Sequence, residues 1–209
     1  MKYAMLIFIL IGFLLSGNVA AQHTTHQERV VERYKSNWSR LIPRQTKIQY
    51  AGSMGMFSFG PGWYYGRKNQ WETDWFIGFI PEINGAKGHI TTTLKQTYTP
   101  FQISLGNRIV LEPLTSGIYI NKIFGPYFWN KLPEKYPKNY YFWAVNTRFN
   151  ISLGQAITVN IRDCIVDEKL SAFYEFSTND LYIISAIGNK AIGIGDIIGL
   201  SLGIRYRVF

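Results

Sequence analysis

The chain has a single cysteine, Cys164, among its 209 residues. One thiol excludes an internal disulfide framework and any metal site built from several cysteines. Charged residues are also scarce, at 17%, against ~25% in a typical soluble domain. Long apolar runs are missing as well, since a membrane-spanning helix needs ~20 consecutive apolar residues and the longest run here has 12. A helical membrane protein is therefore not expected.

Aromatic side chains are abundant, with 14 Tyr, 14 Phe and 6 Trp. Disordered chains are poor in aromatics, so we expect a folded chain, and its length fits one domain. The formal net charge is +9. That charge is compatible with nucleic acid, an anionic membrane surface, or solubility alone.

Residues 1–21 have the pattern of a secretory signal peptide. Lys2 supplies a positive charge, residues 4–15 are apolar, and Val19-Ala20-Ala21 is a small-residue cleavage site. An uncleaved membrane anchor is the alternative, but the apolar run is short for that role. Export is therefore predicted, and a nucleic-acid partner is not.

Residues 22–45 are predicted to contain a short amphipathic helix. Val30, Tyr34, Trp38 and Leu41 follow at steps of four, four and three, which places them on one helical face. This face either lies at a membrane surface, with Trp38 at the level of the headgroups, or packs on the rest of the fold; a mobile leader segment is the remaining alternative. The sequence leaves both uses open.

From residue 46 to residue 209 apolar and polar residues alternate with a period of two, which predicts β-strands with one apolar face. We expect eight strands, over residues 47–66, 71–80, 89–100, 108–123, 140–153, 157–162, 171–187 and 197–208. A change of face across residues 52–55 predicts a bulge or bend in the first strand. Pro61 and Pro113 predict irregular pairing. This count puts the connection 124–138 on the same side as the termini.

Two all-β arrangements explain the alternation. In a soluble sandwich or barrel the apolar faces point inward, whereas in an outer-membrane barrel they face lipid and the polar faces fill the lumen. The strongest strands have the length that crosses a bilayer. Aromatics gather near strand ends, as in an interfacial girdle, for which we select Trp38, Trp63, Trp71, Tyr141 and Tyr206. These features favour a closed antiparallel transmembrane β-barrel; a soluble periplasmic binding barrel is the alternative.

The end of the chain adds a resemblance. Residues 197–209 form an amphipathic strand that ends in Phe209, and with the signal pattern this resembles small Gram-negative outer-membrane β-barrel proteins. The resemblance implies recognition of the last strand by the barrel-assembly machinery, contact with outer-membrane lipid or lipopolysaccharide, and room for a protein partner. In this sequence Phe209 falls on the polar register. An eight-stranded interior is filled by side chains, so no open pore is expected.

Charged residues on the polar faces are predicted to form an ion-pair network in the lumen, because a buried charge needs a partner. These residues are Glu72, Asp74, Arg148, Arg162, Glu175, Arg205 and Arg207. We expect Glu175 to pair with Arg205 or Arg207 across the last two strands. The alternative use of these side chains is a binding or catalytic constellation.

The outline also resembles two families of lipid A-modifying barrel enzymes, the palmitoyltransferases and the 3-O-deacylases. Both resemblances imply a serine activated by histidine. The mature chain offers His23, His26 and His89, none beside a suitable serine. Residues 175–179 come nearest to the deacylase motif, but they lack its histidine and contain one extra residue. We therefore predict no catalytic residue, cofactor or metal, and keep a lipid A-modifying enzyme as an alternative to a structural or binding barrel.

Overall fold

A computed structural model describes residues 29–35, 37–82, 87–125, 146–162, 167–189 and 193–208. The chain separates into two compact units, Met1–Ile42 and Pro43–Phe209. The predicted signal peptide lies outside the described residues.

In the first unit, residues 29–35 and 37–39 are helical. The rings of Tyr34 and Trp38 are 5.9 Å apart, as expected for neighbours one turn apart on a helix. Together with Val30 and Leu41 these side chains are exposed. In the part of the chain that the structure describes, no helix is both long and apolar enough to cross a membrane.

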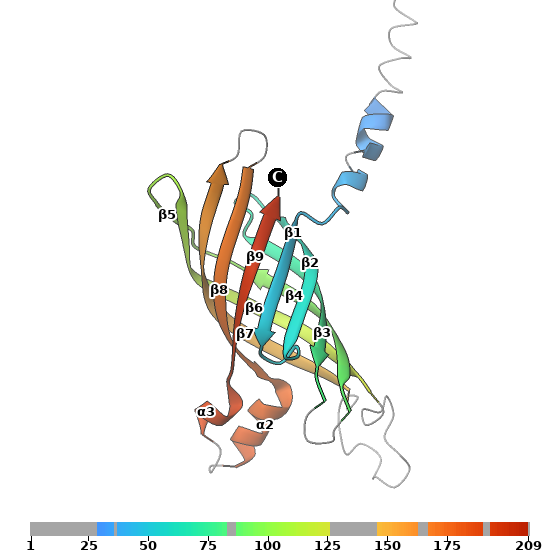
Figure 1. The fold of residues 1–209 in the computed structure, drawn as a ribbon, viewed down its shortest axis with the longest axis vertical. Helices are drawn as coiled ribbons and strands as arrows, with labels where there is room; N and C mark the ends of the chain where they lie inside the picture. Colours follow the sequence, from blue (N-terminus) through green and yellow to red (C-terminus); the bar gives the residue numbers. More distant parts are fainter. Residues whose placement is uncertain are drawn as a thin grey trace, which may run out of the picture. The chain divides into compact units, whose positions relative to one another are not determined.

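The second unit is a closed antiparallel β-barrel (Figure 1). Its strands are β1 (Gln45–Ala51), β2 (Phe57–Tyr65), β3 (Trp71–Ile80), β4 (His89–Tyr98), β5 (Ile103–Leu105), β6 (Ile109–Phe124), β7 (Thr147–Arg162), β8 (Asp167–Asn179) and β9 (Gly199–Val208). Pairing of β9 with β1 and of β4 with β6 closes a ring of eight strands. The short β5 pairs with the start of β6. The predicted eight-stranded closed barrel is confirmed.

Two errors in dividing the chain into strands cancelled in the strand count. One predicted strand is in fact two strands, and two predicted strands are in fact one. Residues 47–66 are a hairpin of β1 and β2, not one bent strand, because Ala51, Gly52 and Gly55 adopt positive φ and reverse the chain. The two strands predicted over 140–153 and 157–162 are one described strand, β7, which runs without interruption from Thr147 to Arg162. Residues 140–145 lie outside the described part.

The corrected count also moves the connection after β6. We call the end of the barrel where β1 begins and β9 ends the terminal end, and the opposite end the far end. Because β6 is the fifth strand of the closed ring, Phe124 lies at the far end, and so does Thr147 at the start of β7. The prediction that placed this connection beside the termini was wrong.

The strand predicted over 171–187 ends earlier than expected. After β8 the chain forms helix α2 (Asp180–Gly188), and the short helix α3 (Ile194–Ile197) precedes β9. The Asn179 side chain caps α2 by accepting a hydrogen bond from the Tyr182 backbone N–H at 2.9 Å. Asn179-Asp180 was the available sequence signal, since both residue types favour a helix N-terminus. Both helices lie at the far end (Figure 1).

Of the two prolines that predicted irregular pairing, Pro113 marks a clear break. The pairing of β6 with β7 shifts register between Glu112 and Thr115, since proline has no N–H to donate to the ladder. Pro61 stays in register with Thr46 on β1.

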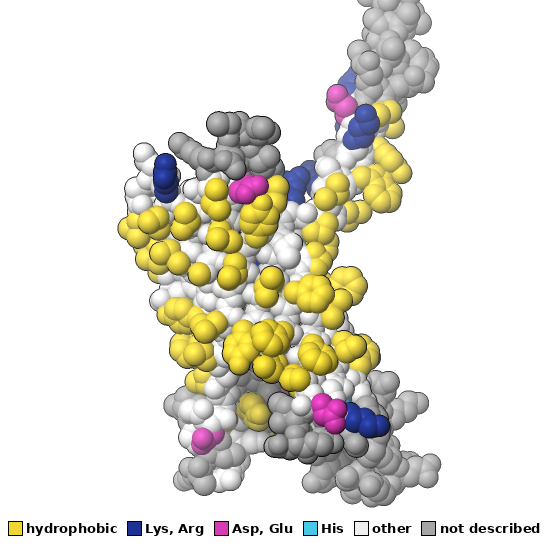
Figure 2. Space-filling view, viewed as in Figure 1, with side chains coloured by type: hydrophobic (Ala, Val, Ile, Leu, Met, Phe, Trp, Pro, Cys, Tyr) yellow, Lys and Arg dark blue, Asp and Glu magenta, His cyan; other side chains and the backbone are white. Residues whose placement is uncertain are grey.

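The polarity of the barrel is inverted relative to a water-soluble domain. Large apolar side chains point outward on every long strand and form the yellow surface of the face drawn in Figure 2. The exposed fractions are 54–64% for Ile48, Phe59, Ile118, Leu153 and Ile204. Most side chains buried inside are polar or charged, and the buried apolar cluster consists of Met54, Phe76 and Tyr119. The core of this barrel is therefore hydrophilic.

Candidate functional site: the polar lumen

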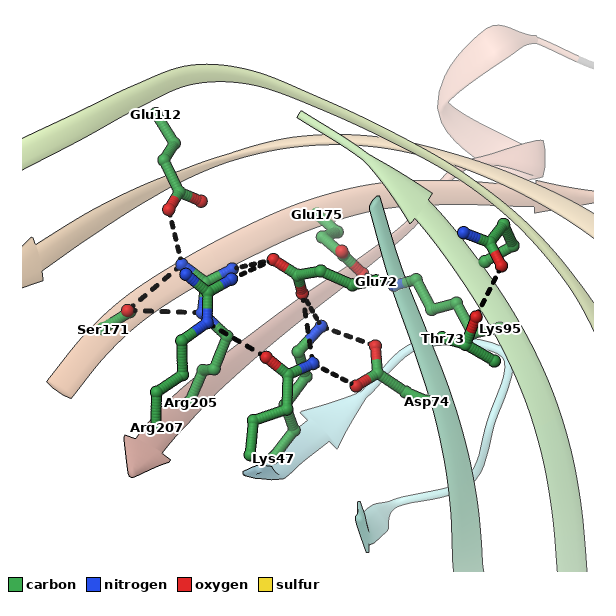
Figure 3. A network of polar contacts seen from close by, with 12 residues as sticks. Lys47, Glu72, Thr73, Asp74, Lys95, Glu112, Ser171, Glu175, Arg205 and Arg207 are labelled. Atoms are coloured by element: carbon green, nitrogen blue, oxygen red, sulfur yellow. Dashed lines mark hydrogen bonds and ion pairs between the residues drawn. The ribbon is translucent and has the colours of Figure 1, made fainter. Parts of the chain in front are cut away.

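The largest ion-pair network in the lumen is centred on Glu72 of β3 (Figure 3). Its Oε2 accepts from Lys47 Nζ at 2.6 Å, and its Oε1 accepts from Arg205 Nη1 at 2.9 Å and from Arg207 Nη2. The Glu72 side chain is fully buried. One carboxylate thus joins β3 to three cations on β1 and β9, which satisfies its charge in a site without water contact.

Asp74, also on β3, extends the network. Lys47 Nζ contacts its Oδ2 at 2.6 Å, and Gln45 Nε2 donates to its Oδ1 at 2.7 Å. Gln45 Oε1 in turn accepts from Arg207 Nε at 3.0 Å. The amide of Gln45 therefore links the acidic and basic ends of the cluster.

Glycine on β2 allows this contact between strands that are not neighbours. Strand β2 lies between β1 and β3 and places Gly62 on the lumenal face. A Cβ at Gly62 would lie 2.1 Å from Asp74 Oδ1 and 2.8 Å from Gln45 Nε2. Any larger residue here would push the two side chains apart, so the glycine creates the space in which they meet.

Arg205 of β9 carries the network across the barrel. Besides Glu72, its guanidinium binds Glu112 Oε1 at 2.7 Å and Ser171 Oγ at 3.1 Å. It also donates to Thr158 Oγ1 at 3.3 Å. These partners lie on β3, β6, β7 and β8, so a single arginine connects opposite walls.

A second, separate ion pair joins Lys95 of β4 to Glu175 of β8. The predicted pairing of Glu175 with Arg205 or Arg207 was wrong, because the β8–β9 register places Ser201 opposite Glu175 and Ser171 opposite Arg205. Glu175 instead pairs with Lys95, whose side chain extends across the lumen from β4. Lys95 Nζ also lies 5.5 Å from the centre of the Tyr119 ring.

The structure brings four of the seven predicted network residues, Glu72, Asp74, Arg205 and Arg207, into one cluster. Glu175 lies in the separate pair, Arg148 lines a cavity at the far end, and the side chain of Arg162 lies outside the described part.

Sequence reasoning missed three charged members of these clusters, Lys47, Lys95 and Glu112. Lys47 lies in residues 47–66, which were predicted to form a single bent strand, and Glu112 adjoins the irregularity at Pro113. Lys95 belongs to a strand with polar residues on both faces, but it shares its register with Thr91, Thr93 and Thr97, which was the available signal.

An apolar layer separates the ionic half of the lumen from the far end. The β1–β2 turn buries Met54 against Phe76 and Tyr119. Thr91 Oγ1 donates to the Met54 carbonyl, and Asn121 Nδ2 donates to the Ser53 carbonyl, so the turn is held by side chains of β4 and β6. Met54, Phe76 and Tyr119 are thus buried together inside the barrel.

Aromatic residues gather at both rims of the outer surface. At the terminal end Trp71 lies opposite Tyr65 and Tyr98, with 4.5 Å between the Trp71 and Tyr98 ring centres. At the far end Phe57 lies opposite Phe79, and its ring centre is 5.2 Å from that of Tyr50.

Of the aromatic residues selected from the sequence, Trp71 and Tyr206 are exposed near the terminal rim, and Trp63 is partly buried there. Trp38 is exposed in the first unit. Tyr141 lies outside the described residues.

His89 is at the start of β4, and His23 and His26 fall outside the described part. In the ranges that the structure describes, no group of three or more His, Cys, Asp or Glu side chains is placed to hold a metal ion.

By its fold and its lumen, this protein belongs to the class of closed eight-stranded antiparallel β-barrels with a hydrophilic, ion-paired interior. No protein-family model, curated protein or solved structure matches the chain significantly.

Proposed function

We propose that this chain is an integral β-barrel protein of a Gram-negative outer membrane, with a sealed lumen and a structural or binding role. The observation that carries the proposal is the inverted polarity of the barrel. Apolar side chains cover the outside of the barrel strands, while charged and hydroxyl side chains fill the inside. A bilayer is the solvent in which this arrangement is favourable, since lipid replaces water at the apolar wall.

The size of the apolar surface supports this environment. Soluble monomers rarely expose contiguous apolar patches larger than a few hundred Å². Here such side chains lie on all eight strands of the closed ring, and seven of those strands have 9–16 residues. About 9–11 residues cross a bilayer at a tilt, so the strands are long enough. The two aromatic rims lie where headgroups would meet the acyl chains.

The sequence supports the outer membrane in particular. Residues 1–21 have the signal pattern that directs export. The amphipathic final strand β9 is the segment expected to engage the barrel-assembly machinery, and its outward residues Leu200, Leu202 and Ile204 are exposed. Outer-membrane lipid or lipopolysaccharide is the proposed partner of the outer wall.

A sealed lumen supports a structural or binding role over conduction. The Glu72 cluster, the Lys95–Glu175 pair and the Met54 layer cross the interior in succession. Ion transport would require these buried pairs to separate, and breaking a buried pair costs about 3–5 kcal/mol.

Refolding into phospholipid vesicles tests the proposal. We expect a protease-protected barrel that stays with the vesicles after carbonate washing, migrates faster on gels when unheated, and gives no conductance steps in a planar bilayer. The same chain should fractionate with outer membranes in a Gram-negative host. A folded monomer that stays in buffer without detergent would refute membrane insertion, and steady conductance would refute the sealed lumen.

A further inference from the structure

A cavity of about 480 Å³ opens at the far end of the barrel, beyond the Met54 layer. Side chains from the β1–β2 turn, β6, β7, β8 and α2 line it. Its volume falls in the range of small-molecule sites, ≈ 300–1,000 Å³. None of the residues in the ion-pair clusters described above lines this cavity, so the cavity is a separate feature of the lumen.

The cavity carries a cation with which no described acidic side chain forms an ion pair. The buried ion pairs use four cations and four anions, Lys47, Lys95, Arg205 and Arg207 with Glu72, Asp74, Glu112 and Glu175. Arg148 is not one of these paired cations. It lies opposite Asn121 in the β6–β7 register and lines the cavity. Among the described residues it has no acidic partner within ion-pair distance, and its Nη1 reaches only the Thr147 carbonyl at 3.5 Å.

A buried amide beside Arg148 has an open acceptor. Asn150 is 3% exposed, its Nδ2 donates to the Arg148 carbonyl at 3.2 Å, and its Oδ1 has no hydrogen-bond partner in the described structure. A buried acceptor without a donor costs free energy. Asn150 lines the cavity, and so does Asn179, which lies opposite it on β8. A ligand that donates a hydrogen bond would satisfy Oδ1.

The remaining wall is partly apolar. Met56, Ile80, Ile123 and Tyr182 also line the cavity. Such a wall suits the C–H face of a saturated ring. The cavity thus combines one surplus cation, one open acceptor and an apolar surface, and a single ligand must match all three.

From this combination we infer that the far-end cavity binds a phosphorylated sugar. Its phosphate pairs with Arg148, a ring hydroxyl donates to Asn150 Oδ1, and the ring packs against Ile123 and Tyr182. The same chemistry is offered by a free sugar phosphate and by the headgroup of a phosphorylated glycolipid. This inference goes beyond the proposed membrane role and does not require it, because the cavity belongs to the folded barrel in detergent as well.

Calorimetric titration of the refolded full-length mature chain in nonionic detergent tests the inference. Glucose 6-phosphate should bind saturably, and more tightly than glucose or inorganic phosphate. Arg148→Gln should weaken binding about tenfold or more, the effect of losing a charge-assisted hydrogen bond. Asn150→Ala should weaken glucose 6-phosphate but leave phosphate unchanged. Lys122→Gln is the matched control, because Lys122 Nζ lies 5.5 Å from the centre of the Phe124 ring and does not line the cavity.

Heat-modifiable migration of each variant verifies that it has folded. Absence of saturable binding, equal binding by Arg148→Gln and the parent, or the same loss in Lys122→Gln would overturn the inference. Equal affinity for phosphate and glucose 6-phosphate would overturn its sugar component. Micelles that contain a phosphorylated glycolipid distinguish the sources: tighter binding to them than to the free sugar supports the headgroup, and the reverse supports the free ligand. All of these binding measurements use detergent. Sugar phosphate binding can therefore be absent while the barrel still inserts into vesicles, and it can be present while insertion into vesicles does not occur.

Discussion

The two ends of the lumen use the same inward strand positions in different ways. Toward the terminal end, the inward side chains form a compact, charge-balanced cluster that includes Lys47, Glu72 and Arg205. At the far end the cavity is lined by three asparagines, a serine, glycines and apolar side chains, with Arg148 as a cation that no described carboxylate neutralises. The comparison separates two roles for buried polarity: one end holds the strands together, and the other is open for a ligand.

The difference follows from how the strands contribute side chains. At the terminal end, Gly62 on β2 leaves room for Gln45 and Asp74 to meet. At the far end, the β1–β2 turn places Met54 in the lumen and leaves the cavity beyond it. Close packing stabilises the first region, whereas the second keeps unfilled volume and a charge that no described carboxylate pairs with.

The largest effect is expected from Glu72→Gln. This change removes the carboxylate that Lys47, Arg205 and Arg207 share, and leaves buried cations undercompensated. We expect a loss of about 3–5 kcal/mol in the free energy of unfolding, measured by urea titration of the refolded barrel with circular dichroism. The control is Glu82→Gln, at an exposed carboxylate, which should change it by less than about 0.5 kcal/mol. Equal stability of the two variants would show that the cluster does not hold the barrel.

The next largest loss of stability is expected from a charged substitution on the outer wall of the barrel. Ile204 lies opposite Ile48 and Ala172 and is 54% exposed. Replacement by Arg should cost about 2–4 kcal/mol in lipid vesicles if the site lies at the midplane. Val208→Arg, nearer the terminal rim on the same face, should cost about 0–1 kcal/mol. Equal costs at the two positions would contradict a lipid-facing wall.

The Lys95–Glu175 pair lies between the two regions and can be isolated by a double-mutant cycle. Glu175→Gln and Lys95→Met should each destabilise the barrel, and the double variant should recover part of the loss. A coupling energy of about 0.5–3 kcal/mol is expected for residues in direct contact. The same cycle with Glu175→Gln and Arg207→Met should show almost no coupling, since Arg207 is not a partner of Glu175. Strong coupling in that second cycle would instead support the pairing expected from the sequence.

The smallest effect on stability is expected at the cavity itself. Arg148→Gln should change the free energy of unfolding by less than about 0.5 kcal/mol, because this arginine forms no described ion pair. Urea unfolding without added ligand is the measurement, with Glu72→Gln as the sensitive comparison. A large loss would place Arg148 in the structural network and remove the distinction between the two ends.

Much of the architecture could be read from residue order alone. Alternation in stretches such as Trp71–Ile80 and Gly199–Val208 predicted strands with opposed faces, and it selected Glu72, Asp74, Arg205 and Arg207 for the inside. A period of two is a local property of extended backbone, so it needs no knowledge of neighbours. For the same reason, the pattern alone did not reveal that residues 47–66 turn back on themselves.

Which charges meet was decided only by the tertiary structure. Register set Ser201 opposite Glu175, and closure of the barrel brought Lys95 across to it. Likewise, Asn121, Arg148 and Asn179 are far apart in the sequence and line one cavity only because β6, β7 and β8 are adjacent. Sequence periodicity determines which face a side chain occupies, but contacts across a closed barrel depend on strand order, stagger and curvature, which arise when the sheet closes.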